Sequence, residues 1–236
     1  MWAWHASALT QAPQDMAVWD GHTHTGIRDP DGTSTHAVVG SYYRDRGDRK
    51  RAAQHFRRAI ELSVDNDFAI RQYIGGGANH AEKRERVAFV QAELERQPIF
   101  GDAVFALRDN AGTVLDPDEL SKTLNSIAKA RPDLWQIWSV RITELAERGK
   151  TDEALALAAQ AAERFPLLPR LWSDLADAHR IKGDRKARVE ALRRAIELSP
   201  SWSWAKRELA LALDEIGERD VALQILERCV SDSPLD

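Results

Sequence analysis

Apolar residues recur every three or four positions along most of this chain, in short stretches separated by turn residues. This spacing places apolar side chains on one face of a helix and predicts amphipathic helices rather than strands. Three apolar rows also repeat at intervals of 34 residues, with Glu93 as their one discordant member. The rows are Phe56, Val90, Leu124, Ala158, Leu192 and Leu226; Ala59, Glu93, Ile127, Ala161, Ala195 and Cys229; and Ile60, Leu94, Ala128, Ala162, Ile196 and Val230. The pattern predicts six helices that share one core face.

Proline repeats at the same interval. Six of the nine prolines lie on one 34-residue grid, and a valine occupies its remaining position. The grid consists of Pro30, Val64, Pro98, Pro132, Pro166, Pro200 and Pro234. Because proline cannot continue a helix, each is expected to close a helical hairpin. A fixed period of this length is typical of a solenoid, in which each unit packs on its neighbours.

Glycine and acidic residues mark the turn inside each predicted hairpin. Glycine suits the left-handed residue that ends the first helix, because it has no Cβ. The turn glycines are Gly47, Gly149, Gly183 and Gly217. An acid at the following position of the repeat is expected to cap the second helix. These acids are Asp48, Glu82, Asp116, Asp184 and Glu218.

The fifth 34-residue unit carries the motif of a known family, formed by Trp172, Leu175, Ala176, Gly183, Asp184, Ala195 and Pro200. On these residues the chain resembles the tetratricopeptide repeat. The match is strong over 135–236 and 33–66, and rests on register alone between 67 and 134. The resemblance implies an all-α fold, a right-handed α-solenoid of about six helical hairpins after a degenerate N-terminal unit. The expected units are 1–32 (degenerate), 33–66, 67–100, 101–134, 135–168, 169–202 and 203–236.

Two segments depart from the repeat. Three consecutive glycines at 75–77 each cost about 1 kcal/mol in a helix interior relative to alanine, so the first helix of that unit is expected to end early. Residues 101–116 alternate like a hairpin around Asn110 and Gly112, but a short helix over 102–110 preserves the period and is the favoured interpretation. Asp116 as cap and Pro117 in the first turn then predict the next helix.

One segment suggests an alternative function, that of a metal-binding module or a metal-dependent hydrolase. The Asp-Gly-His-Thr-His sequence at 20–24 resembles the first-strand motif of metal-dependent amidohydrolases, in which two histidines grip a metal. That family requires a barrel of strands and helices, whereas the repeats occupy the chain from residue 33 onward. On a helix, His22 and His24 would point in different directions. We therefore expect no metal, no cofactor and no catalytic residue, and keep His22 and His24 as the alternative metal site.

The family resemblance implies a binding groove lined by the first helix of each hairpin, and hence a non-catalytic scaffold for a peptide or protein segment. Its groove-facing positions fall on Arg71, Gln72, Gln136, Ser139, Thr143, Arg170, Ser173, Asp174, Asp177, Arg180, Trp204, Arg207 and Glu208. A further alternative is an accessory module of a larger enzyme complex. Trp202 and Trp204 are candidate anchors for a partner, and the favoured interpretation is that at least one of them packs between neighbouring units.

Composition limits the kinds of partner and the cell compartment that we expect. A net charge of −4 indicates no general affinity for nucleic acid or anionic membranes, and no apolar stretch is long enough to cross a bilayer. The single cysteine, Cys229, is expected to be a buried packing residue and favours the reducing cytoplasm. No polar capping helix follows the last predicted helix, so a partner, a second copy or the continuation of a longer array is expected to cover it.

Overall fold

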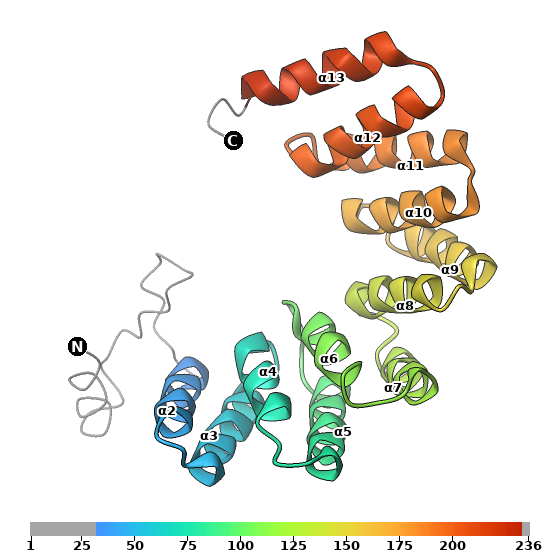
Figure 1. Cartoon of the computed structure of the whole chain (residues 1–236). Coiled ribbons are helices and arrows are strands. Elements are labelled where there is room, and N and C mark those ends of the chain that lie inside the picture. Colours follow the sequence, from blue (N-terminus) through green and yellow to red (C-terminus); the bar gives the residue numbers. More distant parts are fainter. Residues whose placement is uncertain (1–31, 233–236) are drawn as a thin grey trace. The chain divides into compact units, whose positions relative to one another are not determined.

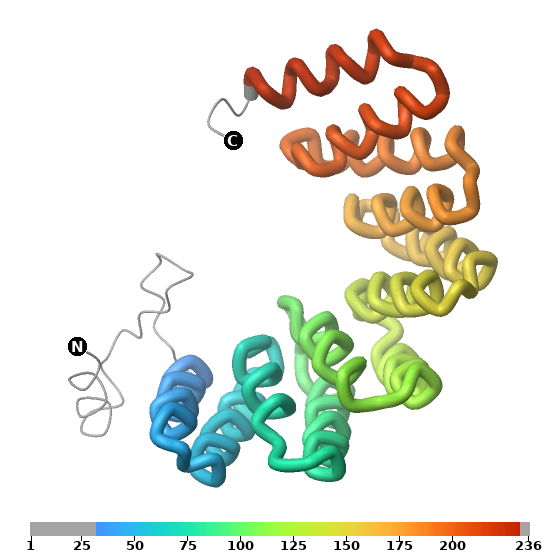
Figure 2. The backbone as a smooth tube through the Cα atoms, viewed as in Figure 1, coloured from blue at the N-terminus to red at the C-terminus, as the bar shows by residue number. Residues whose placement is uncertain are grey.

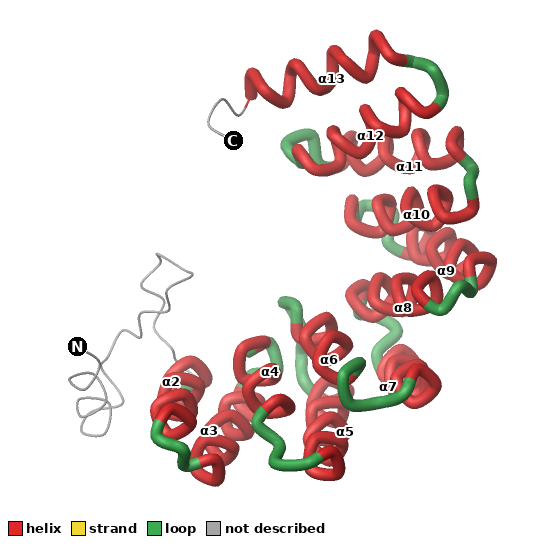
Figure 3. Tube along the Cα trace, in the orientation of Figure 1, coloured by secondary structure: helices red, strands yellow, loops and turns green. Residues whose placement is uncertain are grey.

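The computed structural model describes residues 32–232, and every element in that range is an α-helix (Figures 1 and 3). The chain divides into two compact units between Arg131 and Pro132. Unit 1 contains α2 (Thr33–Asp45), α3 (Arg49–Leu62), α4 (Asp67–Gly75), α5 (His80–Arg96), α6 (Ala103–Ala111) and α7 (Pro117–Ala130). Unit 2 contains α8 (Trp135–Glu147), α9 (Thr151–Arg164), α10 (Pro169–Lys182), α11 (Arg185–Leu198), α12 (Ser203–Glu215) and α13 (Arg219–Asp232). The predicted all-α fold of helical hairpins is confirmed.

The chain reverses at tight turns between paired helices, as the backbone trace shows (Figure 2). All four predicted turn glycines adopt the left-handed conformation, with φ of 78° at Gly47, 73° at Gly149, 81° at Gly183 and 89° at Gly217. A side chain at these positions would be strained, because L-residues rarely adopt positive φ. Glycine therefore fixes where the first helix of each of these hairpins ends.

Side-chain caps begin several of the second helices. The caps predicted at Asp48, Asp116 and Asp184 are confirmed, since each carboxylate accepts a backbone N–H in the first turn of its helix. The cap predicted at Glu82 is wrong, because Asn79 caps α5 and Glu82 lies in its first turn. Glu82 instead accepts the N–H of Ala78 from inside the helix, at 2.8 Å.

The predicted apolar rows form the core of both units, except on α13. On α3, α5, α7, α9 and α11, residues of these rows are almost completely buried. Those with at most 2% of their surface exposed include Phe56, Val90, Leu124, Ala158 and Leu192. On α13 the same registers are open: Leu226 is 37% and Val230 70% exposed, because no described helix covers that face. Cys229 is only half-buried, so its prediction as a buried packing residue is corrected.

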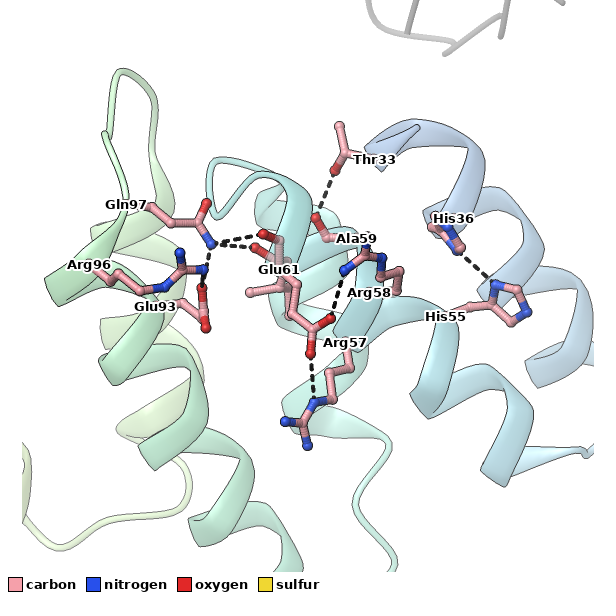
Figure 4. Close-up of polar contacts among 11 residues, drawn as sticks. Thr33, His36, His55, Arg57, Arg58, Ala59, Glu61, Glu93, Arg96 and Gln97 are labelled. Atoms are coloured by element: carbon pink, nitrogen blue, oxygen red, sulfur yellow. Dashed lines mark hydrogen bonds and ion pairs between the residues drawn. The ribbon is translucent and has the colours of Figure 1, made fainter. Parts of the chain in front are cut away.

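The two exceptions in the sequence pattern, Val64 and Glu93, both contact Gln97. The backbone N–H of Val64 donates to Gln97 Oε1 at 2.9 Å. Gln97 Nε2 donates to Glu93 at 2.5 Å (Figure 4). Gln97 is 7% exposed, and Nε2 also donates to the carbonyl of Ile60 at 2.9 Å. Proline has no N–H to donate. This buried amide therefore accounts for the valine on the proline grid and for the acid on the apolar row.

Both departures from the repeat are resolved as short helices. The early end predicted for the first helix of the 67–100 repeat is confirmed, because α4 stops at Gly75. The guanidinium of Arg86 donates to the carbonyl of Tyr73 at 2.5 Å and thereby satisfies the end of α4. The helix predicted over 102–110 is also confirmed as α6, and the hairpin alternative is wrong. Asp116 caps α7, whose first residue is Pro117.

Candidate functional site

Two of the predicted groove residues, Arg71 and Gln72, lie on α4 of unit 1. Arg71 is exposed and pairs with Asp67 one turn earlier, at 2.7 Å. Gln72 Oε1 accepts a hydrogen bond from Arg44 Nη1 at 2.7 Å, which links α4 to α2. Both residues are accessible, and both already have partners on the surface of unit 1.

Four predicted groove residues of unit 2 are buried, and this part of the prediction is corrected. Gln136, Ser139, Ser173 and Asp174 are each at most 6% exposed. Ser139 and Ser173 share one register of the repeat, and their helices α8 and α10 pack against each other. Small side chains at such a register allow two helices to approach closely. Thr143 is half-buried, and its hydroxyl donates to the carbonyl of Ser139 at 3.1 Å.

Asp174 places a buried carboxyl group between α8 and α10. Oδ1 accepts from Arg170 Nε at 3.0 Å, whereas Oδ2 is buried and has no hydrogen bond among the described residues. Burial raises the pKa of the Asp174 carboxyl, and the nearby Arg170 guanidinium and Ser139 hydroxyl oppose that rise. The result is a polar layer directly beneath the exposed side chain of Arg170.

The accessible predicted residues on α10 are Arg170, Asp177 and Arg180. Their side chains are 48%, 46% and 50% exposed, respectively. Arg180 Nε donates to Asp177 Oδ1 at 3.2 Å. Exposed ion pairs of this kind contribute about 0–1 kcal/mol, so a partner can replace them at small cost.

On α12 the predicted residues differ in their surroundings. Arg207 is exposed, and the half-buried ring of Trp204 lies 5.3 Å from that of Trp202, between centroids. Glu208 accepts from Arg188 Nη2 at 2.9 Å, and Arg188 is only 3% exposed. Glu208 is therefore the partner of a buried guanidinium, and its own side chain stays 25% exposed.

Sequence reasoning missed two buried arginines, Arg86 and Arg188. They occupy the register that holds alanine in three other units, as Ala52, Ala154 and Ala222. Arg86 contacts Glu82, and Arg188 contacts Glu208 and Glu215. The available signal was an arginine at a small-residue position of the repeat. Each arginine therefore buries a positive charge against a neighbouring helix, Arg86 at the end of α4 and Arg188 on α12.

The predicted metal ligands His22 and His24 lie outside the described residues. Within residues 32–232, no group of three or more histidine, cysteine, aspartate or glutamate side chains is arranged to hold a metal ion. In that same range, no helix combines the length and the apolar character needed to cross a membrane.

Comparison with known proteins identifies the repeat. Residues 169–201, which contain α10 and α11, match the family model of the tetratricopeptide repeat. No curated protein matches the chain.

Solved structures of similar fold share little sequence with it. The Cut9–Hcn1 hetero-tetramer of APC/C aligns with a TM-score of 0.50 and 14% identity, over 89% of this chain and 42% of that one. MamA from Desulfovibrio magneticus RS-1 aligns with a TM-score of 0.49 and 13% identity, over 87% and 98%. YrrB, a tetratricopeptide-repeat protein with an unusual peptide-binding site, aligns with a TM-score of 0.44 and 17% identity, over 85% and 94%. At these identities the likeness concerns the fold.

Proposed function

We propose that the chain is a tetratricopeptide-repeat protein and that it acts as a non-catalytic scaffold, which binds a peptide or protein segment on unit 2. The proposed binding surface, called the α10–α12 surface below, consists of Arg170, Asp177, Arg180, Trp204 and Arg207. The cytoplasm, favoured by the single cysteine, is the proposed location.

The observation that carries this proposal is the contrast between the exposed and the buried residues of α10. Arg170, Asp177 and Arg180 present charges of both signs to solvent, while Ser173 and Asp174 are buried against the rest of unit 2. The charged side chains therefore stand on a packed, rigid base. Such a base lowers the entropic cost of binding, and mixed charge selects partners by complementarity.

Reversing two of these charges tests the proposal. We expect Arg170→Glu/Arg207→Glu to weaken binding to any directly interacting partner by about tenfold or more, because charge complementarity is replaced by repulsion. Partners retained by the tagged wild-type chain are first identified by mass spectrometry. Each is then purified and titrated against both proteins by calorimetry.

A matched charge reversal elsewhere on unit 2 supplies the control. Arg185 and Arg228 are exposed residues of the second helices α11 and α13, so Arg185→Glu/Arg228→Glu makes the same change in net charge. This variant should bind like wild type. Equal affinity of the wild-type chain and the Arg170→Glu/Arg207→Glu variant for every partner would show that the α10–α12 surface is the wrong site.

A further inference from the structure

Two imidazole rings face each other across the first described hairpin. His36 lies on α2 and His55 on α3, and their Nδ1 atoms are 3.0 Å apart (Figure 4). The ring centroids are 5.2 Å apart, with 34° between the ring planes. Both side chains are half-buried, so the pair is fixed by its surroundings and still reached by small ions.

The hairpin that carries this pair is closely packed. The Thr33 hydroxyl donates to the carbonyl of Ala59 at 3.0 Å and ties the start of α2 to α3. At Gly40, a Cβ would lie 2.7 Å from the ring of Phe56, so the two helices touch at that glycine. The ring of Tyr43 stacks on His55, with centroids 5.6 Å apart and 21° between planes. These contacts fix α2 against α3 and hold the His55 ring in place before any ligand arrives.

We propose that His36 Nδ1 and His55 Nδ1 together bind one divalent transition-metal cation such as Zn²⁺ or Cu²⁺. Nitrogen ligands lie about 2.0–2.1 Å from zinc, so two of them at angles of about 90–110° are separated by about 2.9–3.4 Å. The observed separation of 3.0 Å falls in this range. Imidazole nitrogen suits zinc and copper, and water completes the coordination.

Protonation of the pair is compatible with this site. Without metal, one imidazole donates an Nδ1 proton to the other, and metal binding requires that proton to move to Nε2 or to leave. A bound ion would link α2 to α3 and stabilise this hairpin.

Zinc titration of the full chain tests the proposal, with matched histidine variants. We expect one Zn²⁺ per chain by calorimetry, and at least a tenfold loss of affinity in both His36→Ala and His55→Ala. The exposed His80 on α5 provides one control, His80→Ala, which should bind like wild type. A second control, His22→Ala/His24→Ala, should also bind like wild type. Lowering the pH from about 7.5 to about 5.5 should weaken binding, because protons compete for the imidazoles.

Two further measurements separate loss of the site from loss of the fold. His55→Gln removes the imidazole but keeps a polar side chain, and its metal-free helix content by circular dichroism should equal that of wild type. Electron paramagnetic resonance of the Cu²⁺-loaded wild type should show two nitrogen ligands that are absent from His55→Gln. Absence of Zn²⁺ binding, or binding unchanged by both His36→Ala and His55→Ala, would overturn the proposal.

Discussion

Val64 donates its backbone N–H to the buried side chain of Gln97, and proline cannot make this donation. The preceding residue is compatible with proline: Ser63 is extended, with φ −153° and ψ 115°, as a residue before proline prefers. We therefore predict that Val64→Pro lowers the free energy of unfolding by about 1–3 kcal/mol, the cost of leaving a buried polar group without its partner. Urea denaturation followed by circular dichroism measures this loss.

A double-mutant cycle shows whether the hydrogen bond is the cause of that loss. In a Gln97→Ala background the acceptor is already gone, so Val64→Pro should cost much less than in wild type. An equal cost in both backgrounds would assign the effect to the lost valine side chain instead.

Single residues also show where sequence reasoning stops. Ser173 and Arg207 share one register of the repeat, yet Ser173 is buried and Arg207 is exposed. The period assigns both to the first-helix face, and the surrounding packing determines whether a side chain there stays accessible. Likewise, nothing in the spacing of His36 and His55 shows that their rings meet.

At the level of elements, α5 and α7 are joined by one ion pair at the start of α7. The Glu119 carboxylate accepts hydrogen bonds from the Arg84 guanidinium and from the N–H of Asp116, which completes the capping box. These contacts, Arg84 first, lower the pKa of Glu119 to about 2.

We predict that Glu119→Gln lowers the thermal midpoint at neutral pH, and that this difference disappears in acid. Because the folded-state pKa of Glu119 is lowered, ionised Glu119 stabilises the fold above its ordinary value of 4.5. That stabilisation is lost as the pH falls through about 2. Circular dichroism melts from about pH 7 down to about pH 2 follow the difference as it shrinks.

Salt and a neighbouring carboxylate provide the controls. Both side chains of the Arg84–Glu119 pair are partly exposed, so 1 M NaCl should reduce the effect. Glu85→Gln removes the same charge from the exposed face of α5 and should change the midpoint little. A midpoint of Glu119→Gln equal to wild type at neutral pH would show that the ion pair and capping box contribute nothing measurable.

The elements themselves were predictable where local chemistry and the period agree. The left-handed glycines, the cap at Asp116 and the early end of α4 all follow from backbone preferences that act within a few residues. The cap of α5 was missed because Asn79 lies outside the expected register. The buried roles of Arg86 and Arg188 depend on acceptors from other segments, which no local pattern reveals.

On the scale of the whole molecule, a period of 34 residues predicts the fold because each hairpin packs on its neighbours along the chain. The period does not predict which exposed residues bind a partner, because a repeated framework tolerates almost any residue at its exposed positions. The rows of apolar residues identified most of the core, and α13 is the exception because its outer face is open. The fold was therefore far more predictable than the residues that contact a partner.

The division into two units has a testable consequence for unit 2. Its core is built from α8 to α13 alone, around buried side chains such as Leu171, Leu192 and Leu213. We predict that a fragment of residues 132–236 folds by itself and unfolds cooperatively in urea. Its helix content should equal that of the same residues within the full chain. Five of the eight tryptophans lie in this fragment, so their fluorescence reports its unfolding directly.

A shorter fragment, residues 169–236, tests why unit 2 is stable. It lacks α8 and α9, whose contacts with α10 cover Leu171 and Ala176 in the core. Stability in helical repeats is approximately a sum over units and the interfaces between them, and two hairpins make fewer interfaces than three. The shorter fragment should therefore unfold at a lower urea concentration or without a cooperative transition. If it proved as stable as residues 132–236, the α8–α9 hairpin would contribute nothing to the core, contrary to the burial of Ala158, Ala161 and Ala162.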